Sequence, residues 1–396
     1  MPSKRLVFSA ESVTCGQPNK LCDLIVDTIL DGVLRKDRFA RADLQAVAAP
    51  GLVLVSGELT TNTYIDITGT VRQVLTDAGY DNPEIAFNAR SIAVLNLLQE
   101  QSEEVGLAVD KRGASDQGIA IGYATNEAAR LGFDTNLSPV PIWTAHQLAR
   151  KLNEVLVEKK IPGLFSDGQV QVTFMYEDNL PVRLLNATVS TWHSKSVDHK
   201  AISTAVKQKV LRPVIRKLGG IDTKKAVLHV NHTGPFTSGG PTANVGMSGR
   251  TTVMDLYGTA VPTGGKSLSG KDPTKTDRAA TYMARHVAKC VVAAGLAARC
   301  EVRLAYLFGR ERPVSLQVNT FATGVCGTDR DLADTIRKVF DLSTPGIVEH
   351  LDLRRVRYAP ICCFGHIGRP GVPWEDTASA EPLAAACAPK KKGKKK

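Results

Sequence analysis

Segments of alternating apolar and polar residues, arranged in pairs, constrain the fold of this 396-residue chain most strongly. Residues 169–174 (QVQVTF) alternate with period two, which predicts a strand with one buried face, and residues 181–193 are predicted as its hairpin partner. Pro181 is compatible with a strand because it lies at the first residue. Residues 302–308 and 314–321 predict a second pair around a short turn. Strands paired in hairpins favour an α+β fold over a regular alternation of strands and helices.

Two long helical patterns accompany these strands. Residues 20–35 carry leucine and isoleucine at helical spacing, and Pro18 just before them fits the start of a helix. Residues 277–298 predict a second long helix, capped by Thr276 or Asp277.

Shorter patterns lie between these segments. Residues 52–55 predict a buried strand that ends at Ser56 and Gly57. Residues 201–217 have a helical pattern, but Pro213 is expected to kink the helix or to end its regular part. The chain thus suggests a repeated plan of one long helix with paired strands, although the segments are not similar enough in sequence to establish a repeat.

The charge of the chain is concentrated at one end. The formal net charge is +11, and the lysine-rich residues 390–396 supply six of these charges. We expect residues 379–396 to form a disordered basic tail, with a targeting or nucleic-acid role as the weaker alternative, because a run of like charges is compositional evidence only. No apolar run approaches the ~20 residues of a membrane helix, and the first residues lack the apolar stretch of a signal peptide. The sequence predicts a soluble cytoplasmic protein without membrane or nucleic-acid partners.

The cysteines give no sign of a metal site. Eight occur, none of them in a C-x-x-C pair or with zinc-ribbon spacing. We therefore expect reduced, mostly buried thiols. The adjacent Cys362 and Cys363 are expected to point to opposite faces of a strand, which is a poor arrangement for a shared metal ion.

Two glycine-rich polar stretches are candidates for ligand binding, residues 113–118 (GASDQG) and residues 264–277 (GGKSLSGKDPTKTD). The second has the features of a polyanion site, because glycines let backbone N–H groups approach a ligand, lysines supply charge and a helix N-terminus follows. It is not a P-loop, since the spacing around Gly270 and Lys271 lacks that pattern. From the residues alone, an anion-binding loop and a solvated Gly/Lys loop both stay open.

Five motifs, in order along the chain, resemble those of one enzyme family. They are FSAESV at 8–13 with GQPNK at 16–20, GASDQG at 113–118, YATNE at 123–127, GGKSLSGKD at 264–272, and GHIGR at 365–369 with PWE at 373–375. Their counterparts in the S-adenosylmethionine synthetase (methionine adenosyltransferase) family are FTSESV with GHPDK, GAGDQG, YATNE, GGGAFSGKD, and GHFGR with PWE. The chain is similar to this family from about residue 7 to about residue 376.

The resemblance implies an architecture and an assembly. It implies three similar sheet-plus-helix domains of the α+β class in a pseudo-threefold arrangement. We place the domains at residues 4–103, 113–238 and 239–377, followed by the basic tail at residues 379–396. It also implies a homodimer with active sites between the subunits, a tetramer of two such dimers, or a pairing with a sister chain that completes the site.

The resemblance also implies a reaction between ATP and L-methionine. The methionine sulfur attacks C5′ of ATP and expels the triphosphate, which is hydrolysed to phosphate and diphosphate, and S-adenosylmethionine is formed. The leaving group carries about four negative charges, so the site must supply cations around it. Mg²⁺ and K⁺ are the implied cofactors.

Individual residues match positions with known roles in the family. Lys20, Arg250, Lys271 and Lys275 match the cations that hold polyphosphate, and Asp277 matches a magnesium ligand. Glu58 and Gln101 match positions that hold methionine, and Asp116 and Asp167 match aspartates that contact the nucleoside, with Asp167 facing the ribose. Phe236 matches the aromatic residue that stacks on adenine.

Several other positions depart from the family pattern. Gln17 stands for a histidine near the leaving oxygen, Asn19 for an aspartate metal ligand, Gln45 for a glutamate that serves a monovalent cation, and Asn244 for an aspartate near the methionine ammonium. Gln169 and Thr251 stand for lysines that reach phosphate, Lys266 stands for a glycine, and residues 101–111 differ from the family's gating loop. Neutral amides are poor ligands for Mg²⁺, so we expect weaker binding of both metal ions and triphosphate.

Three functions stay open at this point. The first is an enzyme that forms S-adenosylmethionine with a depleted triphosphate and metal site. The second is a divergent paralogue that binds nucleoside or S-adenosylmethionine with little or no catalysis, as a regulatory or structural subunit. The third is an enzyme that uses a nucleotide with fewer charges. Product formation from ATP and methionine distinguishes them.

Overall fold

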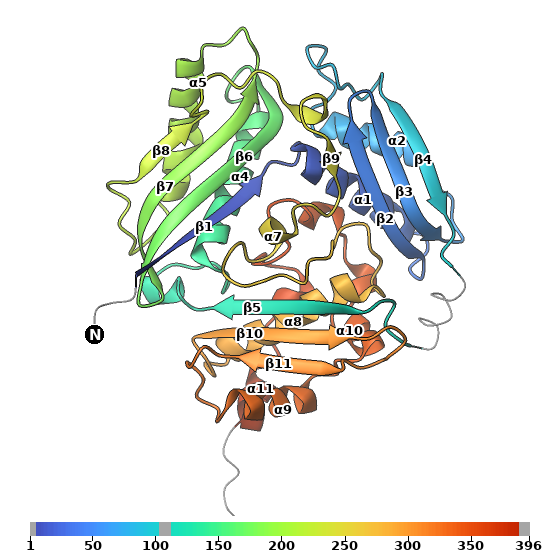
Figure 1. The fold of residues 1–396 in the computed structure, drawn as a ribbon, viewed down its shortest axis with the longest axis vertical. Helices are drawn as coiled ribbons and strands as arrows, with labels where there is room; N and C mark the ends of the chain where they lie inside the picture. Colours follow the sequence, from blue (N-terminus) through green and yellow to red (C-terminus); the bar gives the residue numbers. More distant parts are fainter. Residues whose placement is uncertain (1–4, 103–111, 388–396) are drawn as a thin grey trace, which may run out of the picture.

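Three β-sheets form the body of the protein and lie at the three corners of the view in Figure 1. The computed structural model describes residues 5–102 and 112–387. The first sheet has the strand order β1 (Arg5–Val13), β6 (Leu164–Glu177), β7 (Leu180–His193), β8 (Val227–Val230). The second sheet has the order β4 (Ala93–Gln99), β3 (Leu52–Thr60), β2 (Arg41–Ala49), β9 (Gly246–Met247). The third sheet has the order β11 (Ser315–Asn319), β10 (Arg299–Tyr306), β5 (Gly118–Thr125).

The sheets do not follow the order of the sequence. β1 comes from the N-terminal third of the chain but pairs with β6 along its whole length. In the same way, β5 pairs antiparallel with β10, and β9 pairs antiparallel with β2. The segments 4–103, 113–238 and 239–377 therefore each give their first strand to a neighbouring sheet, and the three parts interlock.

One long helix packs against each sheet. α1 (Pro18–Leu34) contacts β2, α4 (Val140–Val157) contacts β1 and β6, and α8 (Thr276–Ala293) contacts β5 and β10. The other α-helices of the described residues are α2 (Ile67–Asp77), α5 (His199–Val206), α6 (Arg212–Ile215), α7 (Thr252–Asp255), α9 (Asp329–Val339), α10 (Thr344–His350) and α11 (Ala380–Cys387). The predicted α+β class is confirmed. Within residues 5–102 and 112–387, no helix is both long and apolar enough to cross a bilayer.

The sequence periodicity identifies the central elements correctly but misplaces some of their ends. The strand predicted over 52–55 continues through Gly57, which takes a left-handed φ of 113°. A Cβ on Gly57 would lie 2.1 Å from the backbone oxygen of Asp43 on the neighbouring strand, so only glycine keeps the strand paired here. The helix predicted over 201–217 leaves the α-helical form after Val206 and passes through a π-helical turn before Pro213.

The two ends of α8 also differ from the prediction. The helix ends at Ala293, five residues before the expected end, because Gly295 takes a left-handed φ of 70° just beyond it. The N-cap position belongs to Lys275, and no side-chain hydrogen bond caps the helix. The predicted cap at Thr276 or Asp277 is therefore wrong, which leaves the Asp277 carboxylate for other contacts.

The predicted tail is folded over its first half. α11 packs against α8 and α9, and Leu383 is fully buried. A disulfide joins Cys387, the last residue of α11, to Cys326. The expectation of a disordered tail from residue 379 is thus wrong up to residue 387, and so is the expectation that all eight thiols are reduced. Residues 388–396, with the lysine run, lie outside the described residues.

The paired cysteines also differ from the expected arrangement. Cys362 and Cys363 follow the short 3₁₀ helix Ala359–Ile361 and are not in a strand. Their sulfur atoms lie 3.9 Å apart, and both side chains are buried. The prediction that the two thiols face opposite ways is wrong, because the alternation of a strand does not apply to this backbone.

A buried carboxylate on α1 holds the glycine-rich loop that precedes α8. Asp27 Oδ1 accepts hydrogen bonds from Gly270 N–H (2.8 Å) and from the Arg278 guanidinium (2.7 Å). Neither Asp27 nor Arg278 is exposed to solvent. The backbone of the same loop binds β2, since Leu44 N–H donates to Gly270 O. These contacts fix the loop between the second and third sheets.

Candidate functional site

A cavity of about 360 Å³ lies where the first sheet meets the segment that leads to β9. Five residues singled out from the sequence line it: Gln17, Asp167, Gln169, Phe236 and Asn244. These residues are far apart in the sequence, and the strand exchange between sheets brings them together. We call this space the aromatic cavity, after Phe236.

Asp167 is the buried charge of the aromatic cavity. It lies on β6 with 8% of its surface exposed, and its Oδ2 accepts a hydrogen bond of 2.9 Å from Gly240 N–H. Burial raises the pKa of Asp167 to about 6, although the Gly240 N–H favours the ionised form. The carboxyl group therefore ionises close to neutral pH, and among the described residues no hydrogen bond to its second oxygen is found.

Two of the neutral replacements are engaged with backbone N–H groups. Gln17 is the N-cap of α1, and its Oε1 accepts hydrogen bonds from the N–H groups of Asn19 (2.9 Å) and Lys20 (3.2 Å). Asn19 Oδ1 accepts a hydrogen bond of 3.1 Å from Met247 N–H on β9. Both amides therefore stabilise the local backbone, and their oxygens are not directed to a ligand.

The ammonium group of Lys20 is paired with carboxylates inside the protein. Its side chain is buried, and its Nζ lies 2.9 Å from Asp23 Oδ2 and 2.5 Å from Asp255 Oδ1. Thr251 Oγ1 lies within hydrogen-bond distance of both carboxylates. Burial raises the pKa of Asp255 to about 6, and the nearby ammonium opposes this effect. The structure therefore assigns Lys20 and Thr251 to a buried network and does not place them in the aromatic cavity.

A second group of candidate residues gathers around the start of α8. Lys271 Nζ lies 2.5 Å from Asp277 Oδ2 and 4.0 Å from Asp43 Oδ2, and a backbone bridge pairs Asp43 with Lys271. Lys266 Nζ binds Asp116 Oδ2 and lies 3.8 Å from Asp277 Oδ1. We call these five residues the lysine cluster. None of them lines the aromatic cavity.

The charges of the lysine cluster shift one another's pKa values. Partial burial opposes the ionisation of Asp116, but the Lys266 ammonium and the Gln117 N–H outweigh it and lower the pKa of Asp116. Burial raises the pKa of Asp43 above its ordinary value, in spite of Lys271 and Lys275 nearby. Sequence reasoning missed Asp43, because no motif contains it and only the strand register places it beside Lys271.

Three further candidates lie on or beside the outer face of the second sheet. Gln45 is exposed, and its Oε1 accepts a hydrogen bond from Ser248 Oγ (2.9 Å). Glu58 lies opposite Asp43 in the pairing of β2 with β3. Gln101 N–H donates to Thr60 Oγ1, while its side-chain Nε2 is buried without a hydrogen-bond partner among the described residues. The expected gating loop spans residues 101–111. Its residues 103–111 lie outside the described residues.

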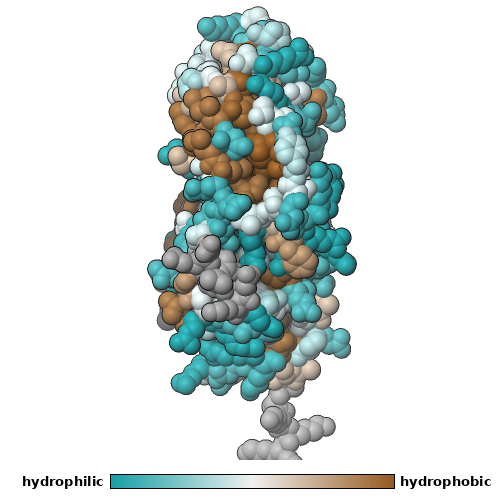
Figure 2. All heavy atoms as spheres, turned by 90° about the vertical axis from the view of Figure 1, so that its right-hand side faces the viewer, coloured by the Kyte–Doolittle hydropathy of each residue, from teal (hydrophilic) through white to brown (hydrophobic). Residues whose placement is uncertain are grey.

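The outer face of the second sheet is apolar around these candidates. Figure 2 shows a hydrophobic area over this part of the surface. Side chains pointing outward from the sheet include Val47, Leu52, Leu54, Leu95, Leu97 and Met247. Leu97 has 62% of its surface exposed and Leu95 has 47%. An apolar face of this kind marks an interaction surface.

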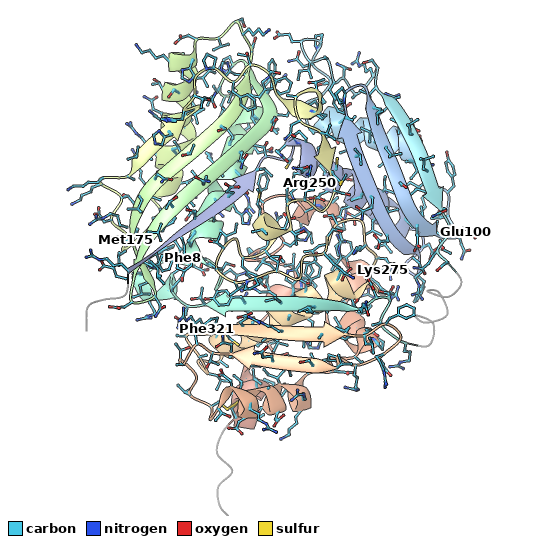
Figure 3. All side chains as sticks on the ribbon, in the orientation of Figure 1. Phe8, Glu100, Met175, Arg250, Lys275 and Phe321 are labelled. Atoms are coloured by element: carbon cyan, nitrogen blue, oxygen red, sulfur yellow. A yellow bond between two sulfur atoms is a disulfide. The ribbon has the colours of Figure 1, made fainter. Side chains whose placement is uncertain are left out.

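The remaining two cations lie on different segments. Arg250 is exposed and follows β9, whereas Lys275 is buried at the N-cap of α8 (Figure 3). Lys275 is close enough to the lysine cluster for its charge to act on Asp43, whereas Arg250 is not among the residues that line the aromatic cavity.

Within the part of the chain that the structure describes, the residues predicted to bind metal ions are not gathered into a set of charged ligands. Among the described residues, no group of three His, Cys, Asp or Glu side chains could hold a metal ion. Asp277 supplies a carboxylate, but its two oxygens face the ammonium groups of Lys271 and Lys266. Asn19 and Gln45 are neutral, and their oxygens accept protein hydrogen bonds. This set of donors does not fit Mg²⁺, which favours several charged oxygens with free lone pairs.

Comparison with known proteins identifies the family. Three family models match in succession: the N-terminal domain of S-adenosylmethionine synthetase over residues 5–103, its central domain over residues 111–236, and its C-terminal domain over residues 238–376. This chain belongs to the S-adenosylmethionine synthetase family. The S-adenosylmethionine synthase of Desulforudis audaxviator is 42% identical over 96% of this chain and 98% of its own length. That of Sorangium cellulosum is 43% identical over 96% of this chain and 90% of its own length. That of Thermus thermophilus is 42% identical over 97% of this chain and 98% of its own length.

Membership of the S-adenosylmethionine synthetase family gives the two groups of residues a common context. ATP binding and dependence on Mg²⁺ and K⁺ are typical of this family. In this chain, the aromatic cavity contains an aromatic ring and a buried carboxylate, which suit a nucleoside. The lysine cluster, together with Lys275, contains three ammonium groups, which suit a polyanion.

Proposed function

We propose that this chain forms S-adenosylmethionine from ATP and L-methionine, with release of phosphate and diphosphate. The observation that carries the proposal is the aromatic cavity, where Phe236 and Asp167 meet although they come from distant parts of the chain. A ring that stacks on a base and a carboxylate that accepts ribose hydroxyl hydrogen bonds together select a nucleoside. The matching of all three family domains supports the same reaction.

The difficult step is the departure of the triphosphate from C5′. As the methionine sulfur forms its bond to C5′, negative charge builds up on the leaving oxygen. Preorganised cations lower the energy of this transition state most effectively when they are already held in place. Lys266, Lys271 and Lys275 supply three such cations, and the carboxylates of Asp116 and Asp277 hold the first two in position.

We place the complete active site between two copies of the chain. The aromatic cavity and the lysine cluster have no lining residue in common. Asp43 and Glu58 lie on the outer face of the second sheet, within the apolar surface that a second copy would cover. A two-fold contact through this face would bring the cluster of one copy to the other copy. A homodimer, or a tetramer of such dimers, follows from this placement.

The aromatic cavity contributes little to triphosphate binding. Gln169 replaces a lysine, and its Nε2 donates to Glu11 Oε2 at 3.2 Å. Gln17 and Asn19 have their amide oxygens bound to backbone N–H groups. The triphosphate therefore depends on the lysine cluster and on Arg250, while the cavity selects the nucleoside.

The test is a product assay with the purified full-length protein. ATP, L-methionine, Mg²⁺ and K⁺ are supplied, and sulfonium product and phosphate are measured together. We expect both products in equal amounts on the first turnover, at ~1 per second or faster at saturation. A protein that binds adenosine but forms no sulfonium product would contradict the proposal.

A further inference from the structure

Lys266 occupies an unusual place in the lysine cluster. It follows Gly264 and Gly265 in the loop before α8. A Cβ on Gly264 would lie 1.9 Å from Ile119 O, so the loop can approach β5 this closely only with glycine. Gly265 then takes a left-handed φ of 81°, which turns the chain. The two glycines bring the Lys266 side chain to the carboxylates of Asp116 and Asp277.

The ammonium group of Lys266 bridges two carboxylates. Its Nζ binds Asp116 Oδ2 and Gln117 O (2.8 Å) and lies 3.8 Å from Asp277 Oδ1. An ammonium has three N–H donors, and among the described contacts two are used at hydrogen-bond distance. Because 39% of the side chain is exposed, the third donor can reach a ligand.

Asp277 is shared between two lysines. Lys271 Nζ lies 2.5 Å from Asp277 Oδ2 on one side, and Lys266 lies near Oδ1 on the other. A divalent cation bound to Asp277 would lie close to both ammonium groups, and like charges at this distance repel strongly in a partly buried site. Gly118 keeps room for this arrangement, since a Cβ there would lie 3.0 Å from Asp277 Oδ1.

We propose that Lys266 is a tethered cation that takes the place of a metal ion between Asp116 and Asp277, so that the chain binds a triphosphate there without a divalent metal. The inference rests on the proposed function for the identity of the ligand as a nucleoside triphosphate. It goes beyond that function because it assigns to a side chain the charge that a dissociable ion would supply.

Inorganic tripolyphosphate is the probe, because its binding does not depend on turnover. Calorimetry in the presence of EDTA compares the unaltered protein with Lys266→Ala, Lys266→Arg and Lys224→Ala. Lys224 is an exposed lysine before β8, remote from the cluster, and its variant removes the same charge. We expect metal-free binding to the unaltered protein, at least ~10-fold weaker binding to Lys266→Ala, and near-normal binding to Lys266→Arg and Lys224→Ala. Added Mg²⁺ should restore binding to Lys266→Ala in part.

Two results would overturn the inference. One is an unaltered protein that binds tripolyphosphate only with Mg²⁺, and the other is a Lys266→Ala variant that binds it without metal as tightly as the unaltered protein. Thermal unfolding of each variant checks that the comparison concerns folded protein. The proposed function is judged separately by sulfonium formation, so a failure of either claim can be recognised without the other.

Discussion

The aromatic cavity and the lysine cluster differ in how they handle charge. Among the described residues that line the cavity, Asp167 is the only carboxylate, and Gln17 and Gln169 contribute neutral amides. In the cluster, ammonium and carboxylate groups alternate within 4.0 Å of one another. The difference suggests the division of tasks that we propose, in which a ring and a single carboxylate select the nucleoside in one place and ammonium groups compensate the charge of the phosphates in the other.

Removal of a cation from the cluster should have the largest effect. In the Lys271→Met variant, Asp277 loses the buried partner that lies 2.5 Å away. Breaking a buried ion pair by removing one member typically costs ~3–5 kcal/mol, and since Lys266 remains near the carboxylate we expect ~3 kcal/mol less free energy of unfolding. Urea denaturation measures the change, with Lys224→Met as the control. A loss below ~0.5 kcal/mol would show that the pair is solvated like a surface salt bridge.

Removal of the Phe236 ring should weaken the binding of the nucleoside and leave the binding of polyphosphate unchanged. Stacking of a base on an aromatic side chain is worth ~1–3 kcal/mol, so Phe236→Ala should weaken adenosine binding by ~5- to 150-fold. Tripolyphosphate binding should not change, because Phe236 is absent from the cluster. Tyr64→Ala, at a tyrosine with 80% of its surface exposed, is the matched control. An equal loss of affinity for adenosine and for tripolyphosphate would show that the two regions do not bind different parts of the substrate.

The pH dependence of nucleoside binding should follow Asp167. Its pKa of about 6 lies above the ordinary value for an aspartate, so the side chain is ionised at pH 7 and mostly protonated at pH 5. A protonated carboxyl group accepts ribose hydrogen bonds less well, and we expect adenosine binding ~10-fold weaker at pH 5 than at pH 7. Titrations in a series of buffers measure this profile, and Asp167→Asn should bind weakly with a flat profile. A sloping profile that survives in Asp167→Asn would assign the effect to another group.

Restoring one charge in the cavity should have the smallest effect. Gln169→Lys places an ammonium group near Glu11 at an exposed position that lines the cavity. Exposed charge pairs contribute ~0.2–1 kcal/mol, so ATP binding should tighten by no more than ~5-fold. Gln171→Lys is the control, because Gln171 donates to the other oxygen of Glu11 and does not line the cavity. The same gain in both variants would reflect net charge rather than position.

Sequence patterns predicted the elements of this fold better than their partners. Helical and alternating periodicity located α1, α8 and the β6–β7 hairpin, because burial of one face produces a regular spacing of apolar residues within each segment. The pairing of β1 with β6 could not be predicted from the sequence around β1, since the two strands lie more than a hundred residues apart. The helix at Ala380–Cys387 was missed because its short, alanine-rich sequence docks mainly through one side chain, Leu383.

The candidate site was predictable only in part. The resemblance to the family pointed to Asp167 and Phe236, which lie outside the five motifs, and the structure brings them into one cavity. The resemblance also pointed to Lys20, but its surroundings depend on Asp255, which lies 235 residues further along the chain. The role of Lys266 required the positions of two carboxylates from different segments. The resemblance therefore identifies side chains that could bind a ligand, and tertiary contacts determine which of them remain available to do so.

A mixing experiment tests the central claim most directly, namely that the cavity of one copy works with the cluster of another. Phe236→Ala and Asp116→Ala each damage one region, and neither variant alone should form S-adenosylmethionine efficiently. After the two are unfolded together and refolded, half of the dimers contain one copy of each and hold one intact composite site. We predict recovery of about a quarter of the unaltered activity in the mixture. No recovery from dimers shown to contain both variants would contradict the account and would place the whole site within a single chain.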